Sequence, residues 1–256
     1  MRRRVTETDI AALFHLNSAN TRTRLPDLSV DDDQRPPRFR TYPEAEHIPL
    51  PGQNLDELTT PLGLALGQRR SYRAFARKPL PLATLGRLLY ASYGVRGYKQ
   101  IEGEWTYDRN SPSAGGLYPL ELYAAVQQVE GLSDGIYHYN ARAAELELRS
   151  AQNEQATIAE MAIGQDMLGD ANLIVGIAAV FARTMWKYGQ RGYRYVWLDA
   201  GHVGQNLYLT ATALNLGAAA VGGFFDRELG ELFALPEDER MIYLVAIGQP
   251  AETSGD

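Results

Sequence analysis

The amino-acid sequence predicts a mixed α+β fold in which helices flank a central antiparallel or mixed sheet. Apolar residues alternate along residues 120–126, as expected for a strand with one buried face. Leucines recur at helical spacing over residues 82–89, and a longer helical pattern runs from Val196 to Leu214. Strands and helices are therefore both present, and the elements below are taken in chain order.

The N-terminal segment is interrupted by prolines and by runs of charge. Residues 1–55 contain Asp31-Asp32-Asp33 and Pro36-Pro37, which break any regular period, so the segment is predicted to be an extended arm. One short helix is expected within it, from Asp9 to Leu16. Two interpretations of the arm remain open: it wraps a partner subunit, or it is a disordered leader. Residues 56–256 are predicted to form one folded domain.

Two helices are predicted at the start of this domain. Thr60 followed by Pro61 is typical of an N-cap and the first helical position, and we expect that helix to end within Gly67 to Ser71. Leucines at positions 82, 85, 88 and 89 have the spacing of a second helix.

The centre of the chain predicts a meander of strands. Apolar residues alternate over residues 120–126, Tyr137 and Tyr139 follow, and Leu146 and Leu148 alternate again. Turns are expected at residues 131–135 and 140–143. The apolar run from Ala171 to Ala182 is too short to cross a bilayer, which takes about 20 residues. It is interpreted as a buried strand with an adjoining turn.

A long core helix and three further elements complete the domain. The helix covers Val196 to Leu214, with Gly201 and Gly204 permitting close approach of another element and Gly217 ending it. The segment from Ala218 to Phe225 follows, then a short helix opened by Asp226, and finally a strand from Met241 to Ile247. Together these elements give the α+β pattern.

Composition excludes several classes of function. The chain has 256 residues and no cysteine, which removes disulfides, thiol nucleophiles, iron–sulfur clusters and cysteine-ligated zinc, so redox chemistry requires a bound cofactor. A net charge of -6 argues against nucleic acid as a partner, because such binding neutralises phosphates with Lys and Arg. No membrane span and no export signal are recognised, so a cytoplasmic location is expected.

The first chemical motif is Arg69-Arg70-Ser71-Tyr72-Arg73. Guanidinium groups beside a hydroxyl suit a phosphate and a neighbouring polyol, because arginine presents forked donors that match phosphate oxygens. The alternative is a solvated C-terminal turn whose arginines complement the helix dipole.

The second motif is the loop from Asn110 to Pro119, which contains Pro112, Ser113, Ala114 and two glycines. Small residues let the backbone approach a flat ligand, while the prolines stiffen the loop, so its amides and the Ser113 hydroxyl can face a ring edge. An ordinary tight loop is the alternative interpretation.

These motifs, with the later segment Val221-Gly222-Gly223-Phe224, resemble the FMN-binding set of the nitroreductase superfamily. Further strings resemble its SagB-type branch, the thiazole/oxazole-forming dehydrogenases: Ser113 to Pro119, Tyr137-His138-Tyr139, Lys187 to Tyr195 and Leu198 to Leu207. The resemblance covers residues 61–250, and the string from Lys187 to Leu207 is its most specific part.

The resemblance implies an FMN-binding, intertwined homodimer with two cofactor sites at the subunit interface. Arg69, Arg70, Ser71 and Arg73 would then hold the phosphate, ribityl chain and pyrimidine edge of FMN. Pro112, Ser113 and Ala114 would approach the ring from the second subunit, and Gly222 and Gly223 would offer amides near its N5. No Lys or Arg follows Arg240, so Arg69, Arg70 and Arg73 would have to bind the phosphate.

Lys187 and Tyr188 correspond to a lysine–tyrosine pair that the family uses to oxidise azolines. Aromatising a thiazoline or oxazoline removes a hydride and a proton, so a base must stand across from the flavin face. Lysine suits this role if burial lowers its pKa, and tyrosine can donate to the ring or relay the proton. Adjacent helical residues point about 100° apart. We therefore expect an irregular segment here, which Gly189 and Gly192 would permit. An exposed lysine beside a core-edge tyrosine is the alternative.

His202 and Asp199 could be mistaken for a catalytic pair on the long helix. A hydrogen-bonded structural role is favoured for His202, and the same holds for His138 in its predicted strand. No metal site is expected from the sequence.

Three functions follow from this reading. The leading one is an FMN-dependent dehydrogenase that oxidises azolines or related C–N units in a peptide or small molecule, with oxygen as the electron acceptor. The second is an NAD(P)H-dependent nitro or quinone reductase. The third is a redox-inactive scaffold among the proteins of a peptide-modification complex. The substrate is expected to depend on the arm, on the loop from Tyr98 to Arg109 and on partner proteins.

Overall fold

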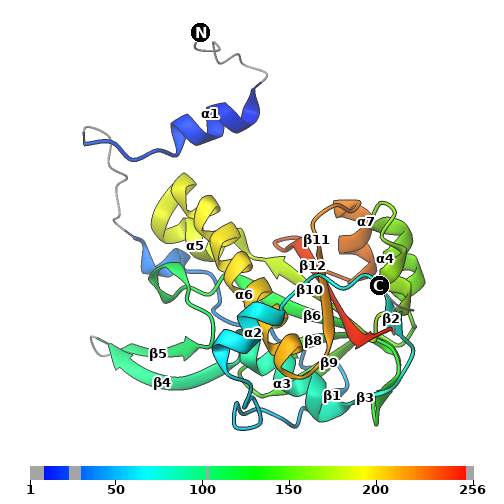
Figure 1. Ribbon diagram of the computed structural model, residues 1–256. Helices are drawn as coiled ribbons and strands as arrows, with labels where there is room; N and C mark the ends of the chain where they lie inside the picture. The colour runs from blue at the N-terminus through cyan, green and yellow to red at the C-terminus, as the bar shows by residue number, and fades with distance from the viewer. Residues whose placement is uncertain (1–8, 23–29, 102–103, 252–256) are drawn as a thin grey trace.

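The computed structural model of the chain describes residues 9–22, 30–101 and 104–251 (Figure 1). Eight strands form the central sheet: β1 (His47–Pro49), β2 (Phe75–Ala76), β6 (Leu120–Val126), β8 (Gly135–Asn140), β9 (Glu145–Ser150), β10 (Leu173–Ala179), β11 (Gly217–Val221) and β12 (Arg240–Pro250). Their order is β1-β9-β8-β6-β10-β12-β11, with β2 paired to β12 outside this path. All of these pairs are antiparallel.

Two smaller strand pairs lie outside the central sheet. The short strands β3 (Leu80–Pro81) and β7 (Val129–Glu130) pair in parallel. The longer strands β4 (Val95–Ile101) and β5 (Glu104–Arg109) form an antiparallel hairpin. The segment from Tyr98 to Arg109 was expected to be a loop, and that expectation is wrong, because its backbone pairs with itself across the hairpin; residues 102–103 lie outside the described part.

The helices complete the predicted α+β pattern. The α-helices are α1 (Ile10–Asn17), α2 (Leu62–Gln68), α3 (Leu82–Tyr93), α4 (Gln155–Met161), α5 (Phe181–Tyr188), α6 (Gly192–Ala213) and α7 (Asp226–Leu232). Short 3-10 turns are η1 (Asp32–Gln34), η2 (Ala114–Gly116), η3 (Asp166–Asp170) and η4 (Gly189–Arg191). The predicted fold class is confirmed, and no described helix is long and apolar enough to cross a membrane.

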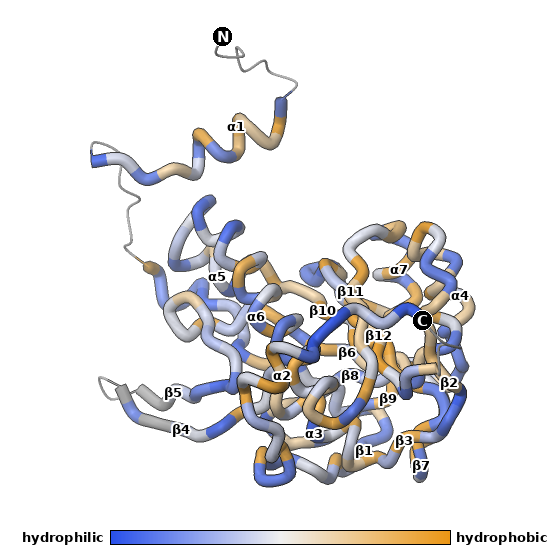
Figure 2. Tube along the Cα trace, viewed as in Figure 1, coloured by the Kyte–Doolittle hydropathy of each residue, from blue (hydrophilic) through white to orange (hydrophobic). Residues whose placement is uncertain are grey.

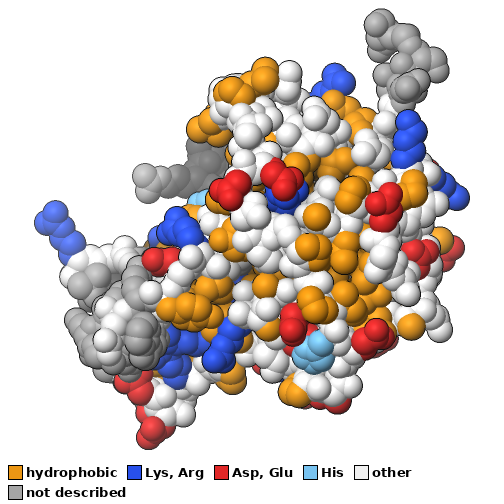
Figure 3. Space-filling model, turned by 90° about the horizontal axis from the view of Figure 1, so that it is seen from below, with side chains coloured by type: hydrophobic (Ala, Val, Ile, Leu, Met, Phe, Trp, Pro, Cys, Tyr) orange, Lys and Arg blue, Asp and Glu red, His pale blue; other side chains and the backbone are white. Residues whose placement is uncertain are grey.

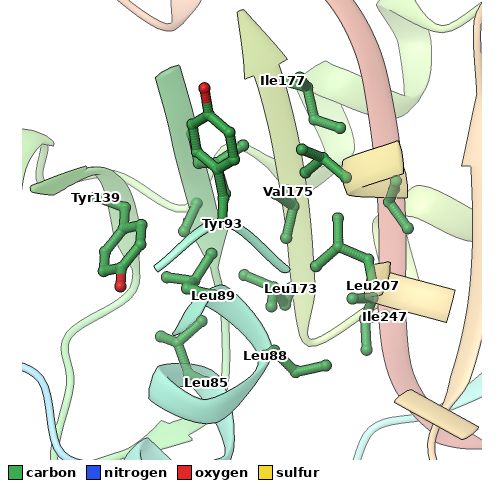
Figure 4. Packing of buried hydrophobic residues seen from close by; sticks show 14 of the residues in the cluster. Leu85, Leu88, Leu89, Tyr93, Tyr139, Leu173, Val175, Ile177, Leu207 and Ile247 are labelled. Carbon is green, nitrogen blue, oxygen red and sulfur yellow. The ribbon is translucent and has the colours of Figure 1, made fainter. Parts of the chain in front are cut away.

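The core lies on both faces of the sheet, because β10 is central and buried on both sides. Leu173, Val175 and Ile177 pack with α3 and α6, whereas Ile174 and Ala178 point the other way, toward α4 and α7. This alternation follows the two-residue period of a strand. Figure 4 shows Leu88 of α3 directed toward Leu173 of β10 and Leu207 of α6, with Leu85 and Leu89 on the side of Tyr139. Figure 2 shows hydrophobic residues concentrated in the central strands.

The long helix α6 is confirmed, although two of its glycines differ in role. A Cβ on Gly204 would lie 2.9 Å from the Tyr243 ring, so glycine is needed there for close packing on β12. Gly201 has nothing within 4 Å of the same position, so close approach to another element of this chain is not its role. The helix ends at Ala213, and the residue of positive φ that follows it is Asn215, at 58°, rather than Gly217, which instead begins β11.

The start of α2 also differs from the expectation. Pro61, not Thr60, is the N-cap residue, and it makes no side-chain cap hydrogen bond. The Thr60 hydroxyl instead donates to the Ala213 carbonyl at 3.2 Å, which ties the entrance of α2 to the end of α6. The predicted end of the helix is confirmed, because α2 stops at Gln68 and Arg69 is its C-cap.

The arm is partly built into the domain. The strand β1 pairs with β9 at the edge of the central sheet, so residues 47–49 belong to that sheet. Before it, the backbone amides of Arg40 and Tyr42 donate to the buried carboxylates Glu121 and Glu147, at 3.0 and 3.1 Å. The helix α1, predicted from Asp9 and capped by that residue, has no buried residue and lies apart from the sheet in Figure 1. The division at residue 55 stays a prediction.

Candidate cofactor and active site

The arginine cluster follows α2 and lies beside a surface pocket. Arg69, Arg70 and Tyr72 line this pocket of about 520 Å³, together with Thr212 and Asn215. Arg69 stacks over the Tyr208 ring at 5.5 Å and Arg70 over the Tyr72 ring at 4.7 Å. Within the described residues, neither arginine forms an ion pair with a carboxylate. Their charge is therefore available to an anionic ligand.

Ser71 is fixed beside this pocket by a tyrosine from α6. The Ser71 hydroxyl and the Tyr208 hydroxyl are 3.0 Å apart, and the Tyr208 oxygen accepts a hydrogen bond from the Ala220 amide at 2.7 Å. Ser71 also forms an isolated parallel bridge with Ala218, and the neighbouring Tyr72 amide donates to the Ala218 carbonyl. The motif thus lies along the start of β11, with Arg73 exposed beside it.

Gly222 and Gly223 lie at the other end of the same strand. Both are exposed, and a Cβ at either position would meet nothing within 4 Å. Ser71 bridges Ala218, four residues before Gly222, which corresponds to about 13 Å along a strand. The arginine cluster and the glycine pair therefore lie at opposite ends of β11, and we call these residues together the basic group.

The proline-bounded loop is anchored to α6 by a carboxylate. The Ser113 hydroxyl donates to Asp199 at 2.6 Å, and the Ala114 amide donates to the same carboxylate at 3.4 Å. The Ser113 oxygen also accepts from the Tyr118 amide at 2.9 Å. The hydroxyl that was predicted to face a ligand thus holds the loop in shape in this chain, while Pro112 is exposed.

Lys187 and Tyr188 form the last turn of α5, directly beside this loop. A Cβ built on Gly115 would lie 2.6 Å from the Tyr188 hydroxyl oxygen, so the tyrosine occupies the space that this glycine leaves. The Lys187 ammonium lies 5.8 Å from the centre of the Tyr188 ring. The helix continues through both residues, and the irregular backbone begins one residue later, at Gly189 with φ of 52°. The expectation of an irregular segment at the pair itself is therefore wrong.

The structure thus gathers the predicted site residues in two groups. The basic group lies along β11, whereas the loop of residues 112–116 lies against Tyr188. Tyr208 holds the first group and Asp199 the second, and these residues are nine positions apart on α6, or about 13 Å. A single helix therefore sets the separation of the two groups.

Burial shapes the electrostatics of the second group. Burial raises the pKa of the Asp199 carboxyl, against the opposing hydrogen bonds from Ser113 and Ala114. Burial also raises the pKa of the Tyr188 hydroxyl, with the nearby Tyr195 and Asp199 adding to the shift. Tyr188 is therefore a protonated hydroxyl at neutral pH, able to donate a hydrogen bond.

The two histidines have different surroundings. His138 is fully buried, with its ring nitrogens 2.8 Å from Glu147 and 3.2 Å from Glu121, so the predicted structural role is confirmed. His202 is exposed on α6, so the expectation of a hydrogen-bonded structural histidine is wrong there, because its position faces outward from the helix. In the described part of the chain, no cluster of three or more acidic or histidine residues is placed to hold a metal.

Sequence reasoning did not assign the positioning roles of three residues, Asp199, Asn206 and Tyr208. Asp199 and Asn206 are seven positions apart, hence on one face of α6, and Asn206 donates to the Ser111 hydroxyl at 3.0 Å. From that spacing, Asp199 and Asn206 could be predicted to hold the proline-bounded loop. The role of Tyr208 has no such signal, because its partners Ser71 and Ala220 are distant in sequence.

These features define an α+β domain with a two-part polar site. The chain belongs to the nitroreductase family, whose profile matches residues 66–249. The resemblance inferred from the motifs, including that to the SagB-type branch, is confirmed by the relatives that follow.

Three curated proteins are similar to this chain. MJ1384 of Methanocaldococcus jannaschii, whose name places it among the nitroreductases, is 37% identical over 72% of this chain and 89% of its own length. The microcin B17-processing protein McbC of Escherichia coli is 27% identical over 52% of this chain and 50% of its own. The trifolitoxin-processing protein TfxB of Rhizobium leguminosarum is 28% identical, over 49% of this chain and 32% of its own. The chain thus spans half or less of the two processing proteins.

Solved structures share the fold. A nitroreductase-class protein of Anabaena variabilis superposes with a TM-score of 0.72 and 29% identity, covering 98% of this chain and 49% of the other. The chain therefore spans about half of that protein's length. A chain of the E. coli microcin synthetase McbBCD complex gives a TM-score of 0.63 at 19% identity, covering 98% of this chain and 85% of the other, which shows likeness of fold alone.

Proposed function

We propose that this chain is an FMN-dependent dehydrogenase that oxidises thiazoline or oxazoline rings, or related C–N units, in a peptide or small molecule. The observation that carries the proposal is the contact between the Tyr188 hydroxyl and Gly115, which places the lysine–tyrosine pair beside the proline-bounded loop. The relation to two proteins named for processing microcin and trifolitoxin supports a peptide-derived substrate.

The basic group fits the phosphate end of FMN. Arg69, Arg70 and Arg73 supply positive charge and Ser71 a hydroxyl, and the pocket beside them is lined by polar side chains. Gly222 and Gly223 leave open space above their backbone, as an approaching ring would require. When bound, FMN supplies the acceptor for a hydride.

The loop and the pair fit the opposite side of such a ligand. Pro112, Ser113 and Ala114 present backbone and small side chains, held by Asp199, to a flat ring. Because the two groups lie about 13 Å apart along α6 in one chain, we propose that each cofactor site combines the basic group of one subunit with the loop of its partner. This arrangement is a homodimer.

Lys187 and Tyr188 carry the proton chemistry of the proposed reaction. Lys187 lies half-buried at the end of α5, where its amine can take the proton from the carbon next to the oxidised one. The protonated Tyr188 hydroxyl donates to the ring heteroatom and orients the substrate. Both roles are performed by side chains of the protein, so neither requires a bound metal ion.

Anaerobic mixing of the purified flavoprotein with an azoline peptide tests this proposal. Bleaching of the flavin absorbance by the azoline, with formation of the aromatic azole detected by mass spectrometry, is the expected result. Lys187→Ala should keep the flavin and lose the bleaching. A protein that remains colourless after reconstitution with FMN, or unchanged turnover in Lys187→Ala, contradicts the proposal.

The similarity to MJ1384 favours a second candidate, an NAD(P)H-dependent reductase of nitroaromatics or quinones. NADH or NADPH added anaerobically distinguishes the two. Rapid bleaching by a nicotinamide cofactor together with indifference to azolines supports the reductase. We also propose that the dehydrogenase works with other peptide-modification proteins, as the name of the McbBCD complex describes for its own chains.

A further inference from the structure

Two clefts that share part of their lining lie near the lysine–tyrosine pair. The first, of about 510 Å³, lies against Gly115 and runs along β5 to Thr106 and Tyr107. The second, of about 410 Å³, shares Thr106 and Tyr107 and continues to Phe39 of the arm. We call the two together the arm–hairpin groove. Since Gly115 also contacts the Tyr188 hydroxyl, the groove begins at the proposed active site.

The groove is positively charged on an acidic protein. Arg96 lines the first cleft, and Arg38 and Arg142 line the second. Arg96 and Arg142 are exposed. Among the described residues that line either cleft, Asp108, in the first, is the one carboxylate. The whole chain carries a net charge of -6, so the positive charge of the arm–hairpin groove is opposite in sign to the net charge of the protein. In Figure 3, which views the molecule from below, Lys and Arg side chains lie beside an apolar patch.

Aromatic surface lies between the arginines. Phe39 and Tyr107 have ring centres 4.5 Å apart, and the Arg142 guanidinium lies 5.8 Å from the Phe39 ring. Tyr98 on β4 lines the second cleft and is 55% exposed. Clefts lined by both cationic and aromatic side chains suit an extended chain with acidic and apolar side chains.

We propose that the arm–hairpin groove binds an acidic segment of the peptide substrate, on one side of the ring that is oxidised. This inference rests on the proposed function, because it assigns the recognition of the substrate's flanking chain to the same site. Carboxylates of the peptide pair with Arg96 and Arg142, and its apolar side chains pack on Tyr98 and Phe39. The small number of arginines in the groove and the negative net charge of the chain favour a peptide over a polynucleotide.

Fluorescence anisotropy with a labelled peptide of about ten alternating Glu and Leu residues, about 33 Å when extended, tests the proposal. A second peptide with Gln in place of Glu is the neutral control. The purified full-length protein should bind the acidic peptide about tenfold more tightly than the neutral one, and added salt should reduce the difference. Arg96→Glu and Arg142→Glu should each weaken binding of the acidic peptide by about tenfold.

Arg227→Glu is the matched control, because Arg227 is an exposed arginine on α7, outside the groove. It removes the same charge and should leave peptide binding at the wild-type level. Equal binding of the two peptides, or equal loss in all three variants, overturns the proposal. So does tighter binding of a single-stranded oligonucleotide than of the acidic peptide. The peptides contain no azoline, so failure of groove binding is distinct from failure of dehydrogenase activity.

Discussion

Arg183 on α5 forms an ion pair with Glu121 on β6, with 2.6 Å between the charged atoms and both side chains almost fully buried. The Arg183 guanidinium also donates to the Pro37 carbonyl of the arm at 2.7 Å. Glu121 in turn accepts from the Arg40 amide and contacts His138. One pair therefore holds together the sheet, the arm and the helix that ends in Lys187 and Tyr188.

Replacing Arg183 by Met should lower the free energy of unfolding by about 3–5 kcal/mol, because it leaves Glu121 buried without its main counter-charge. Burial alone would raise the pKa of Glu121, but Arg183 and the His138 hydrogen bond outweigh it and hold the pKa at about 2. Urea unfolding measures the loss, and the double variant with Glu121→Gln should recover part of it. A single-variant effect as small as that of the exposed control Arg227→Ala would contradict this account.

Stability should decline above neutral pH through His138. Burial lowers the pKa of His138, but its hydrogen bonds to Glu121 and Glu147 outweigh burial and raise the pKa above its ordinary value of 6.5. A raised pKa in the folded state stabilises the protein fully below the ordinary pKa, and this contribution is lost as pH rises through the folded-state value. Urea unfolding between about pH 6 and about pH 9 should show a steeper decline in wild type than in His138→Gln. Identical pH profiles would rule out this role of His138.

Gly115→Ala should impair turnover more than Gly116→Ala. Both glycines have φ of 64°, so alanine strains either position equally. Only at Gly115 would the new Cβ meet the Tyr188 hydroxyl, at 2.6 Å, whereas Gly116 has nothing within 4 Å. Displacing Tyr188 should reduce kcat by about a hundredfold relative to the Gly116 variant, since small misplacements of catalytic groups are costly. Stopped-flow bleaching of the flavin by the azoline measures the ratio of the rates of the two variants. A ratio near one would show that Tyr188 has no catalytic role.

Arg69→Ala should weaken binding of FMN without weakening that of riboflavin. The arginine is without a carboxylate partner among the described residues and lines the pocket that we assign to the phosphate, which riboflavin lacks. Titration with quenching of flavin fluorescence gives both dissociation constants, and FMN should bind about tenfold to a hundredfold more weakly. An equal loss for both flavins would mean that Arg69 supports the pocket structurally instead of binding phosphate.

Local patterns were sufficient to predict some of the helices and strands. The leucine spacing of α3, the alternation of β6 and the buried run of β10 depend on residues close in sequence, and all three are confirmed. The ends of helices were harder to predict. Gly217 was expected to end α6, but the residue of positive φ after the helix is Asn215. The β4–β5 hairpin was missed because its pairing is set by backbone contacts across the turn.

The sequence by itself determined the α+β class, the family and the identity of the residues in both motifs, since these depend on residue type and order along the chain. Only the tertiary structure decided which motifs lie together. Ser71 joins β11 through Tyr208, and Ser113 joins α6 through Asp199, by hydrogen bonds between residues far apart in sequence. Such contacts arise when the helix α6 packs on the sheet, and no local pattern specifies them.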